Sequence, residues 1–248
     1  MIINYRQGRL APDDVVTHLA LTGGVGPVLF EIVKRREAAQ KARELNLAVT
    51  DEELQKAADA YRAANSLYSA QETYDFFRRN GLSDEDFERF LEDSVLTDLL
   101  RDHLADENKV KEYFINHRSR YDRALISAIV VAGEELANEI KLQVEEDEVD
   151  FALAAGKYSL DEATKQAGGR IGPVSRGAFP PEVSAKVFNA AAGELVGPFD
   201  AGGAFQLIQV HEVRRAELTA GLQEMIKDTI LDEWAQRLIG DEIIIERR

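Results

Sequence analysis

The spacing of the apolar residues changes close to Tyr121. From about Pro12 to His117 they recur three and four positions apart, which is the period of an amphipathic helix. After Tyr121, the segment 124–131 reads ALISAIVV, which is too short for a helix with these flanks and rich in the branched residues that favour a buried strand. We therefore expect a helical region followed by a different domain that is built on a sheet.

Capping sequences mark the helix ends in the first region. The segments 50–53 (TDEE) and 69–72 (SAQE) fit capping boxes, in which a hydroxyl residue and a glutamate three positions later satisfy each other's backbone amides. Gly81 suits the end of a helix, and Ser83 suits the start of the next one. These signals predict about five amphipathic helices.

Two apolar stripes are expected to face the core of the helical region. The first begins where Pro27 fits a first helical turn and consists of Val28, Ile32 and Val33. The second lies beyond Arg215 and needs a partner surface; it consists of Leu218, Leu222, Met225, Ile226, Trp234 and Leu238. The strand-like segment 243–245 is able to pair with residues 2–3, in which case the C-terminal segment completes the helical domain and the sheet region is an insertion.

The second region reads as a small α+β unit with the order β-α-α-β-α-β-β. Its expected strands include 124–131, 171–175 and 205–210, and its expected helices are 134–146, 150–155 and 181–189. We accordingly predict a helical domain over 1–120 plus 215–248 and an inserted domain over 121–214.

Charge and composition exclude several functions. The 30 Lys and Arg against 45 Asp and Glu give a net charge of -15, which is the wrong sign for a nucleic acid or an anionic bilayer. The chain has no cysteine, so it forms no disulfide and no thiolate site. No two of its histidines share a ligand spacing, so we expect neither a metal nor a cofactor; they are His18, His103, His117 and His211.

The N-terminal sequence MIINYRQGRLAPDD has neither the basic stretch nor the long apolar run of a signal peptide. No window approaches 18 uninterrupted apolar residues, so no membrane insertion is expected. These patterns predict a cytoplasmic protein. A trimmed precursor would leave the same sequence, so that alternative stays open.

Several landmarks occur in order between Lys157 and Val210. They are a Tyr-Ser pair, a Gly-Gly-x-Ile-Gly turn at 168–172, Ser-Arg-Gly at 175–177 before an apolar residue and a proline, a helix ending in Val-Phe, Gly-Glu at 193–194, Gly-Pro at 197–198 and a closing strand. In this order they resemble the parvulin domain, which is also called the rotamase or PpiC-type domain. The resemblance covers roughly 123–214. The flanking helices separately resemble the SurA-type chaperone domain, which implies a helical peptide-binding domain.

The parvulin resemblance implies a peptidyl-prolyl cis-trans isomerase with an apolar socket for the proline ring. Ile171, Phe179 and Val183 match the family's socket positions, and Val174 lies beside them. The alternative is that these four residues are ordinary core side chains.

The polar half of the site departs from the family, whose members carry a histidine in the first strand and another in the last. Ala128 and Gln206 occupy those two positions, and Arg170 replaces the usual aspartate of the glycine turn. Gln206 can donate and accept hydrogen bonds but cannot titrate near neutral pH. Asp161 matches the Cys/Asp position, so the resemblance implies Asp161 and Gln206 as the catalytic residues. The alternatives are a solvated loop carboxylate and a polar residue that only satisfies the sheet.

Two functions follow from this resemblance. The first is an isomerase and foldase acting on unfolded or precursor polypeptides with proline-containing segments; the second is a non-catalytic binding chaperone or peptide maturation factor. The layout resembles the cytosolic branch linked to bacterial peptide maturation and export. A third hypothesis, a scaffold subunit for an export or modification enzyme, would be supported by exposure of the helix that contains Trp234. Tyr74, Phe76 and Phe77 fit either a peptide groove or a core.

Overall fold

The computed structural model describes residues 3–5 and 8–240, and the chain divides into two compact units. One unit contains the chain up to Lys111 together with the chain from Ala220 onward, and the other spans Glu112–Thr219. The treatment of these units as separate domains, with borders after 120 and 214, stays a prediction. The expected pairing of 243–245 with 2–3 lies outside the described residues.

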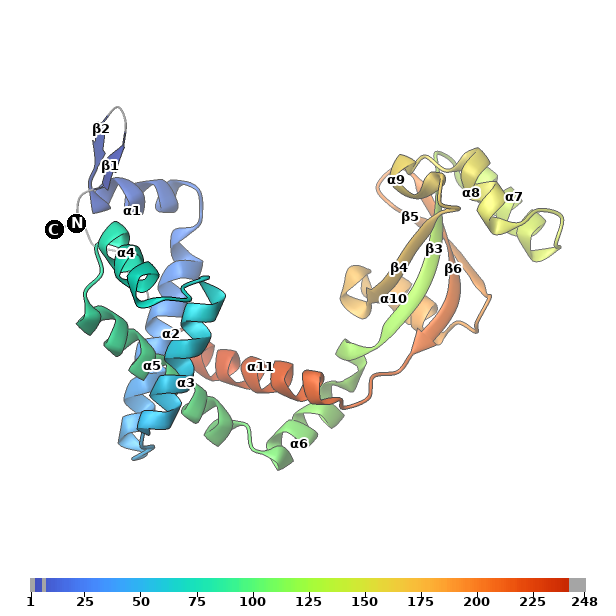
Figure 1. The fold of residues 1–248 in the computed structure, drawn as a ribbon. Helices are drawn as coiled ribbons and strands as arrows, with labels where there is room; N and C mark the ends of the chain where they lie inside the picture. The colour runs from blue at the N-terminus through green and yellow to red at the C-terminus, as the bar shows by residue number, and fades with distance from the viewer. Residues whose placement is uncertain (1–2, 6–7, 241–248) are drawn as a thin grey trace. The chain divides into compact units, whose positions relative to one another are not determined.

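The first unit is helical (Figure 1). A two-stranded antiparallel hairpin, which the sequence patterns did not predict, precedes the helices. Its strands are β1 (Ile3–Tyr5) and β2 (Gly8–Leu10), and the helices are α1 (Pro12–Leu21), α2 (Val25–Glu44), α3 (Asp51–Ala64), α4 (Ala70–Asn80), α5 (Asp84–Leu104) and α11 (Ala220–Ile239). The helix α6 (Glu107–His117) crosses the border between the units.

The predicted helix caps are confirmed. The Thr50 hydroxyl accepts a hydrogen bond from the Glu53 amide at 3.2 Å, and the Glu53 carboxylate accepts one from the Thr50 amide at 2.8 Å. Ser69 and Ser83 form the same reciprocal pair at the starts of α4 and α5. Gly81 ends α4 with a φ of 64°, a conformation that glycine adopts without steric cost.

The core of the helical unit contacts the C-terminal half of α2 and not the turns that carry the predicted Val28 and Ile32 stripe. Val28 and Ile32 are each 45% exposed, whereas Ala38, Ala39 and Ala42 are fully buried. These alanines pack against Leu96 and Leu100 of α5 and Leu231 of α11. Small side chains let the helices approach closely, so this alanine face is buried in place of the larger apolar residues.

The predicted stripe of α11 is partly wrong. Ile226 is fully buried and Trp234 packs at the edge of the core, but Met225 is 58% exposed and Leu238 is 52% exposed. The buried face continues through Leu231, Ala235 and Ile239. α11 packs on α5 and α2, so the exposure of this helix that would support a scaffold subunit is not observed.

The second unit contains a four-stranded antiparallel sheet with the order β4-β3-β6-β5. The strands are β3 (Arg123–Val131), β4 (Arg170–Ser175), β5 (Leu195–Asp200) and β6 (Phe205–Arg214). The helices are α7 (Glu134–Glu145), α8 (Phe151–Tyr158), α9 (Glu162–Lys165) and α10 (Pro181–Asn189), with short 3-10 turns η1 (Arg118–Tyr121) and η2 (Arg176–Ala178). The predicted α+β class and element order are confirmed, with α9 as an additional short helix.

Each face of the sheet has its own core. On one face Ile129, Val131 and Leu207 pack against α7 and α8. On the other, Ala124, Ile126, Ala128, Ile208 and Val210 pack against Val187 and Phe188 of α10. Successive strand residues point to opposite faces, so Ala124, Ile126 and Ala128 join one core and Ile129 and Val131 join the other. In β6 the alternation is interrupted where the pairing with β3 shifts register, since Val210 and Val213 both pack on the α10 side.

No single helix in the described part of the chain is long and apolar enough to cross a membrane. The pair α1 and α2 meets that length and composition only together, across a bend of 114°.

Candidate functional site

The predicted socket residues come from three consecutive elements on the α10 side of the sheet. Val174 lies in β4 opposite Ala124, Phe179 follows η2, and Val183 lies in the first turn of α10. All three are half-buried and pack against the core on this face. Ile171 is 44% exposed and is not part of that core. The structure thus brings three of the four side chains together, and their role as a proline socket stays a prediction.

The positions of the two family histidines lie on the same face. Ala128 pairs with Ile208 and Val130 pairs with Gln206, so Gln206 shares the face of Ala128 and Ile208. Ala128 is only 3% exposed, and its methyl group offers no hydrogen bond. The Gln206 side chain is half-buried and makes no hydrogen bond within residues 3–5 and 8–240.

Asp161 forms the N-cap of α9. Its carboxylate accepts hydrogen bonds from the Ala163 amide at 3.1 Å and from the Thr164 hydroxyl at 2.6 Å. Neither bond reaches Gln206, so the two predicted catalytic residues are not joined by a hydrogen bond in the described chain. This geometry favours the reading of Asp161 as a loop carboxylate that orders its own turn.

Two landmark glycines lie directly against the positions that replace the histidines. Gly169 has a φ of +76°, and a Cβ atom on it would lie 2.3 Å from the Ala128 carbonyl oxygen. Gly197 has a φ of +110°, and its Cβ atom would lie 2.7 Å from the Gln206 carbonyl oxygen. Only glycine fits such close approaches. The motif thus holds the backbone of both positions although the imidazoles are absent.

A buried carboxylate joins the chain segments that enter and leave the sheet. Asp122 is 2% exposed and accepts hydrogen bonds from Arg176 at 3.2 Å, Arg215 at 2.9 Å and the Ala216 amide at 3.0 Å. We call these four residues the Asp122 cluster. Burial alone would raise the pKa of Asp122, but the hydrogen bonds from Ala216, Arg215 and Arg176 together lower it below its usual value.

The Asp122 cluster shows what the Ser-Arg-Gly landmark does in this chain. The Arg176 guanidinium lies 4.4 Å from the centre of the Phe188 ring in addition to its ion pair with Asp122. Arg215 also donates to the Phe188 carbonyl oxygen at 3.1 Å. Arg176 is thus a structural residue. It follows β4 and joins α10 to Asp122, the residue that directly precedes β3. Sequence reasoning missed Asp122 because its partners lie 54 and 93 residues away.

A second long-range pair was also missed. The Ser127 hydroxyl and Nε2 of His211 lie 2.8 Å apart, 84 residues apart in the chain. Ser127 follows Ile126 in β3 and so lies on the face opposite the predicted socket. His211 stands where the pairing of β3 with β6 shifts register. The pair therefore joins two strands at an irregular point, and only the register could have identified it.

A comparison with protein families finds a match within the sheet unit. Residues 128–212 match the family described as rotamase, the PPIC-type PPIASE domain. The chain is 26% identical over 182 residues to the foldase protein PrsA of Caldanaerobacter subterraneus, covering 73% of this chain and 55% of the relative. It is 25% identical over 237 residues to the chaperone SurA of Xylella fastidiosa, covering 88% of this chain and 49% of the relative. The chain thus spans about half the length of these curated relatives.

Two solved structures are similar at lower identity. A peptidylprolyl isomerase, PrsA, from Bacillus anthracis has a TM-score of 0.49 and 20% identity, with 88% of this chain and 100% of that structure covered. The corresponding protein from Bacillus cereus has a TM-score of 0.49 and 21% identity, with 99% and 93% covered. Residues 128–212 thus match the PPIC-type PPIase domain, within a chain that is similar to foldases and chaperones.

Proposed function

We propose that this chain is a foldase that binds unfolded or precursor polypeptides and accelerates rotation about their X-Pro bonds on the α10 side of the sheet. The observation that carries the proposal is the grouping of Val174, Phe179 and Val183 on one core face inside the segment that matches the PPIC-type domain. Gln206 lies on the same face of the sheet.

The chemistry requires no covalent intermediate. Rotation about an X-Pro bond crosses a barrier of about 18 to 20 kcal/mol, because the planar amide loses its resonance when it twists. The twisted amide is less polar than the planar one, so an apolar site that excludes water favours it. Val174, Phe179 and Val183 would hold the proline ring, and Ile171 would lie at the solvent-exposed edge of the site.

Gln206 is the residue that we assign to the peptide itself. Its side-chain NH₂ would donate to the carbonyl oxygen of the residue before proline, which orients the substrate as the bond rotates. Asp161 would act through α9, whose first turn its carboxylate caps, so we assign it a positioning role.

A second function is a binding chaperone whose PPIC-type domain recognises proline segments without accelerating rotation. The observation in its favour is Ala128, a buried methyl group where the family has an imidazole. The same socket residues would then supply affinity alone.

The two functions are distinguished by the isomerisation rate of a short X-Pro peptide, measured by exchange NMR. Foldase activity predicts acceleration that is lost in Phe179→Ala and kept in Leu153→Ala, a control on α8 whose side chain is 70% exposed. Shifts of the Phe179 or Gln206 resonances without acceleration would select the binding chaperone. If the peptide neither isomerises faster nor shifts these resonances, the site assignment is wrong.

The setting of the protein is also a proposal. We propose a cytoplasmic location and an association with peptide maturation or export machinery, on the resemblance of the sequence alone. Immunodetection in fractionated cells tests the location, and co-purification with a membrane or export complex tests the association.

A further inference from the structure

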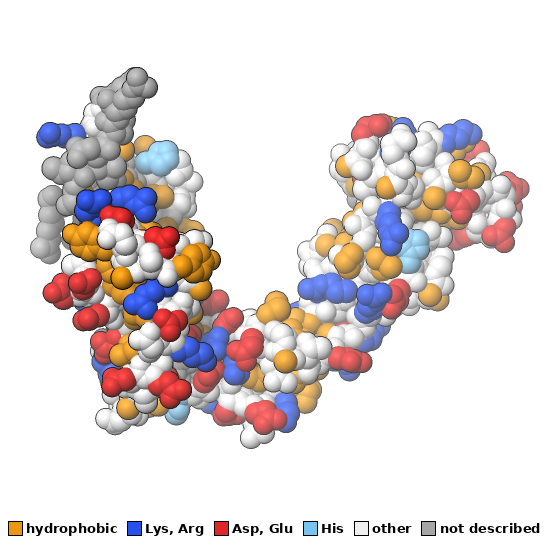
Figure 2. Space-filling view, viewed as in Figure 1, with side chains coloured by type: hydrophobic (Ala, Val, Ile, Leu, Met, Phe, Trp, Pro, Cys, Tyr) orange, Lys and Arg blue, Asp and Glu red, His pale blue; other side chains and the backbone are white. Residues whose placement is uncertain are grey.

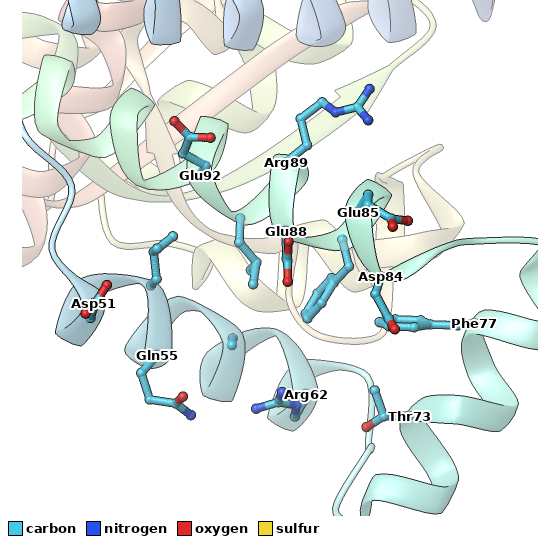
Figure 3. A pocket seen from close by; sticks show the side chains of 14 residues that line it. Asp51, Gln55, Arg62, Thr73, Phe77, Asp84, Glu85, Glu88, Arg89 and Glu92 are labelled. Carbon is cyan, nitrogen blue, oxygen red and sulfur yellow. The ribbon is translucent and has the colours of Figure 1, made fainter.

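The helical unit contains a cavity of about 840 Å³ between α3, α4 and α5 (Figure 3). Its apolar floor includes Ala58, Phe77 and Leu91, which are 6–7% exposed. Phe87 also lines the cavity, and its ring centre lies 5.0 Å from those of Phe77 and Tyr61. Packed aromatic rings give this floor a fixed shape.

A second cavity of about 470 Å³ continues the first. Both are lined by Arg62, Thr73, Phe77 and Asp84. The second adds Tyr68 and Tyr74, whose side chains are 79% and 63% exposed. Of the three aromatic residues that suggested either a groove or a core, Tyr74 and Phe77 line these cavities and Phe76 packs on Tyr61. We call the two cavities together the α3–α5 groove.

The rim of the α3–α5 groove is acidic. Six carboxylates and two arginines line it. Arg62 already pairs with Asp59 at 3.0 Å, whereas Asp51, Asp84, Glu85 and Glu88 make no ion pair among the described residues. Glu88 and Asp84 point into the space between α3 and α5, whereas Arg89 points away from it (Figure 3). Carboxylates also lie beside apolar side chains across the visible face of the helical unit (Figure 2).

Helix stability accounts for only part of this acidity. Asp51, Asp84 and Glu85 stand in first turns, where a negative charge favours the helix N-terminus. Glu88 lies beyond the first turn of α5 and gains little from that effect. An unpaired carboxylate above an apolar floor is instead complementary to a ligand that carries positive charge beside apolar side chains.

We infer that the α3–α5 groove binds extended polypeptide segments in which lysine or arginine alternates with leucine or aromatic residues. The apolar side chains occupy the floor formed by Ala58, Phe77 and Leu91, and the cationic side chains lie at the rim near Glu85 and Glu88. This inference rests on the proposed polypeptide-binding function and adds a charge preference at a site separate from the PPIC-type domain. The aromatic floor supplies affinity, and the rim supplies selectivity.

The probe is a short fluorescein-labelled peptide that alternates lysine with leucine and phenylalanine, with binding followed by anisotropy on the full chain. Two comparison peptides replace lysine with glutamate or the apolar residues with serine. Binding of the first peptide alone, weakened by added salt, is the expected result. Equal binding of the lysine and glutamate peptides would overturn the inference.

The chain offers a matched pair of charge reversals. Glu52 and Glu85 are both exposed and both follow the first residue of a capped helix, but only Glu85 lines the groove. Glu85→Lys should weaken the lysine peptide about fivefold more than Glu52→Lys, and Glu88→Lys should weaken it at least as much as Glu85→Lys. If Glu52→Lys and Glu85→Lys have the same effect, only the overall charge matters and the groove is not the site.

A second readout separates this inference from the proposed function. Denatured lysozyme, a basic protein, is diluted into buffer and its aggregation is followed by light scattering. Suppression by the wild type that is reduced in Glu85→Lys but not in Glu52→Lys supports the inference. If both variants still suppress aggregation, the inference that the α3–α5 groove binds basic polypeptides is wrong, but the proposed foldase function is not affected. Absence of suppression, together with no acceleration of X-Pro rotation, overturns both.

Discussion

The α3–α5 groove and the predicted proline socket are both apolar surfaces, but they are built differently. The groove lies between helices, has aromatic residues in its floor and carries at its rim carboxylates that form no ion pair within the described part of the chain. The socket lies on a sheet, is formed by Val174, Phe179 and Val183, and has one uncharged amide, that of Gln206, on the same face. If both surfaces bind polypeptide as proposed, the groove would select for charge, whereas the socket would select for shape and one hydrogen bond.

The largest expected effect is the destabilisation of the sheet unit, which carries the predicted socket, by a substitution that leaves the helical unit and its groove unchanged. Gly169→Ala places a methyl group 2.3 Å from the Ala128 carbonyl oxygen at a positive φ. We expect a loss of about 4 kcal/mol in the free energy of unfolding of the sheet unit. Urea unfolding followed by amide NMR measures it.

The control for this change is Gly202→Ala, because Gly202 has a similar φ of +78° but nothing within 4 Å of the added Cβ atom. It should cost only about 1 kcal/mol, the penalty of the left-handed backbone alone. The fluorescence of Trp234 in α11 should be unchanged in both variants if the units fold independently. Equal losses in the two variants would show that the close approach to Ala128 is not rigid.

The next largest expected effect is a loss of stability from the Asp122 cluster, which lies where the chain enters and leaves the sheet. Asp122→Asn leaves Arg176 and Arg215 without their buried carboxylate and should destabilise the sheet unit by about 3 kcal/mol near neutral pH. Thermal unfolding monitored by circular dichroism measures the loss. Glu212→Gln, which breaks an exposed pair with Arg214, is the control and should cost less than about 1 kcal/mol.

The Asp122 contribution should also depend on pH. The pKa of Asp122 is lowered in the folded chain, so the unfolded chain takes up its proton first as the pH falls below about 4. The stabilising effect is therefore complete above that pH and is lost as the pH falls towards the folded pKa. The difference in unfolding free energy between wild type and Asp122→Asn should narrow on acidification. A constant difference between about pH 7 and about pH 3 would contradict this account.

A smaller effect concerns the polar half of the socket. Gln206→Leu removes the only amide that we assign to the peptide and should slow the catalysed X-Pro rotation about tenfold, the equivalent of one hydrogen bond. Exchange NMR measures the rate. Gln209→Leu is the control, because Gln209 pairs with Ser127 and lies on the opposite face of β6. An unchanged rate in Gln206→Leu would leave catalysis to the apolar residues alone.

The smallest effect concerns the groove. Thr50→Ala removes the cap of α3, the helix that carries Asp51 and Ala58 to the groove, and should cost about 1 kcal/mol in the helical unit. Urea unfolding followed by the fluorescence of Trp234 measures it. Thr50→Ser keeps the hydroxyl and should restore the stability. If alanine and serine behave alike, the capping hydrogen bond contributes nothing measurable.

Local signals predicted much of the secondary structure. The capping residues Thr50, Ser69 and Ser83 act within their own turns, so the sequence alone identifies them. The strand at 124–131 was equally clear, because its branched residues have no helical period. Which turns of α2 are buried was not predictable in this way, since it depends on how closely α5 approaches Ala38 and Ala42.

The candidate sites were predictable only in part. Motif order matched Ile171, Phe179 and Val183 to the socket positions, with Val174 beside them. The fold packs Val174, Phe179 and Val183 against one core, and Ile171 is 44% exposed. Asp122 with Arg215, and Ser127 with His211, become neighbours only through strand pairing. The acidic rim was unpredictable because Glu85 and Glu88 meet α3 only after the helices pack.

The Asp122 cluster has a mechanical consequence. Arg123 pairs with Arg214, so the first residue of β3 lies beside the last residue of β6. A pulling force on the two flanking chain segments would reach Asp122 and its hydrogen bonds to Arg215 and Ala216 before it reached these strands. The hydrogen bonds of the Asp122 cluster would therefore have to break before β3 and β6 could separate, and their strength would set the force at which the sheet begins to unfold.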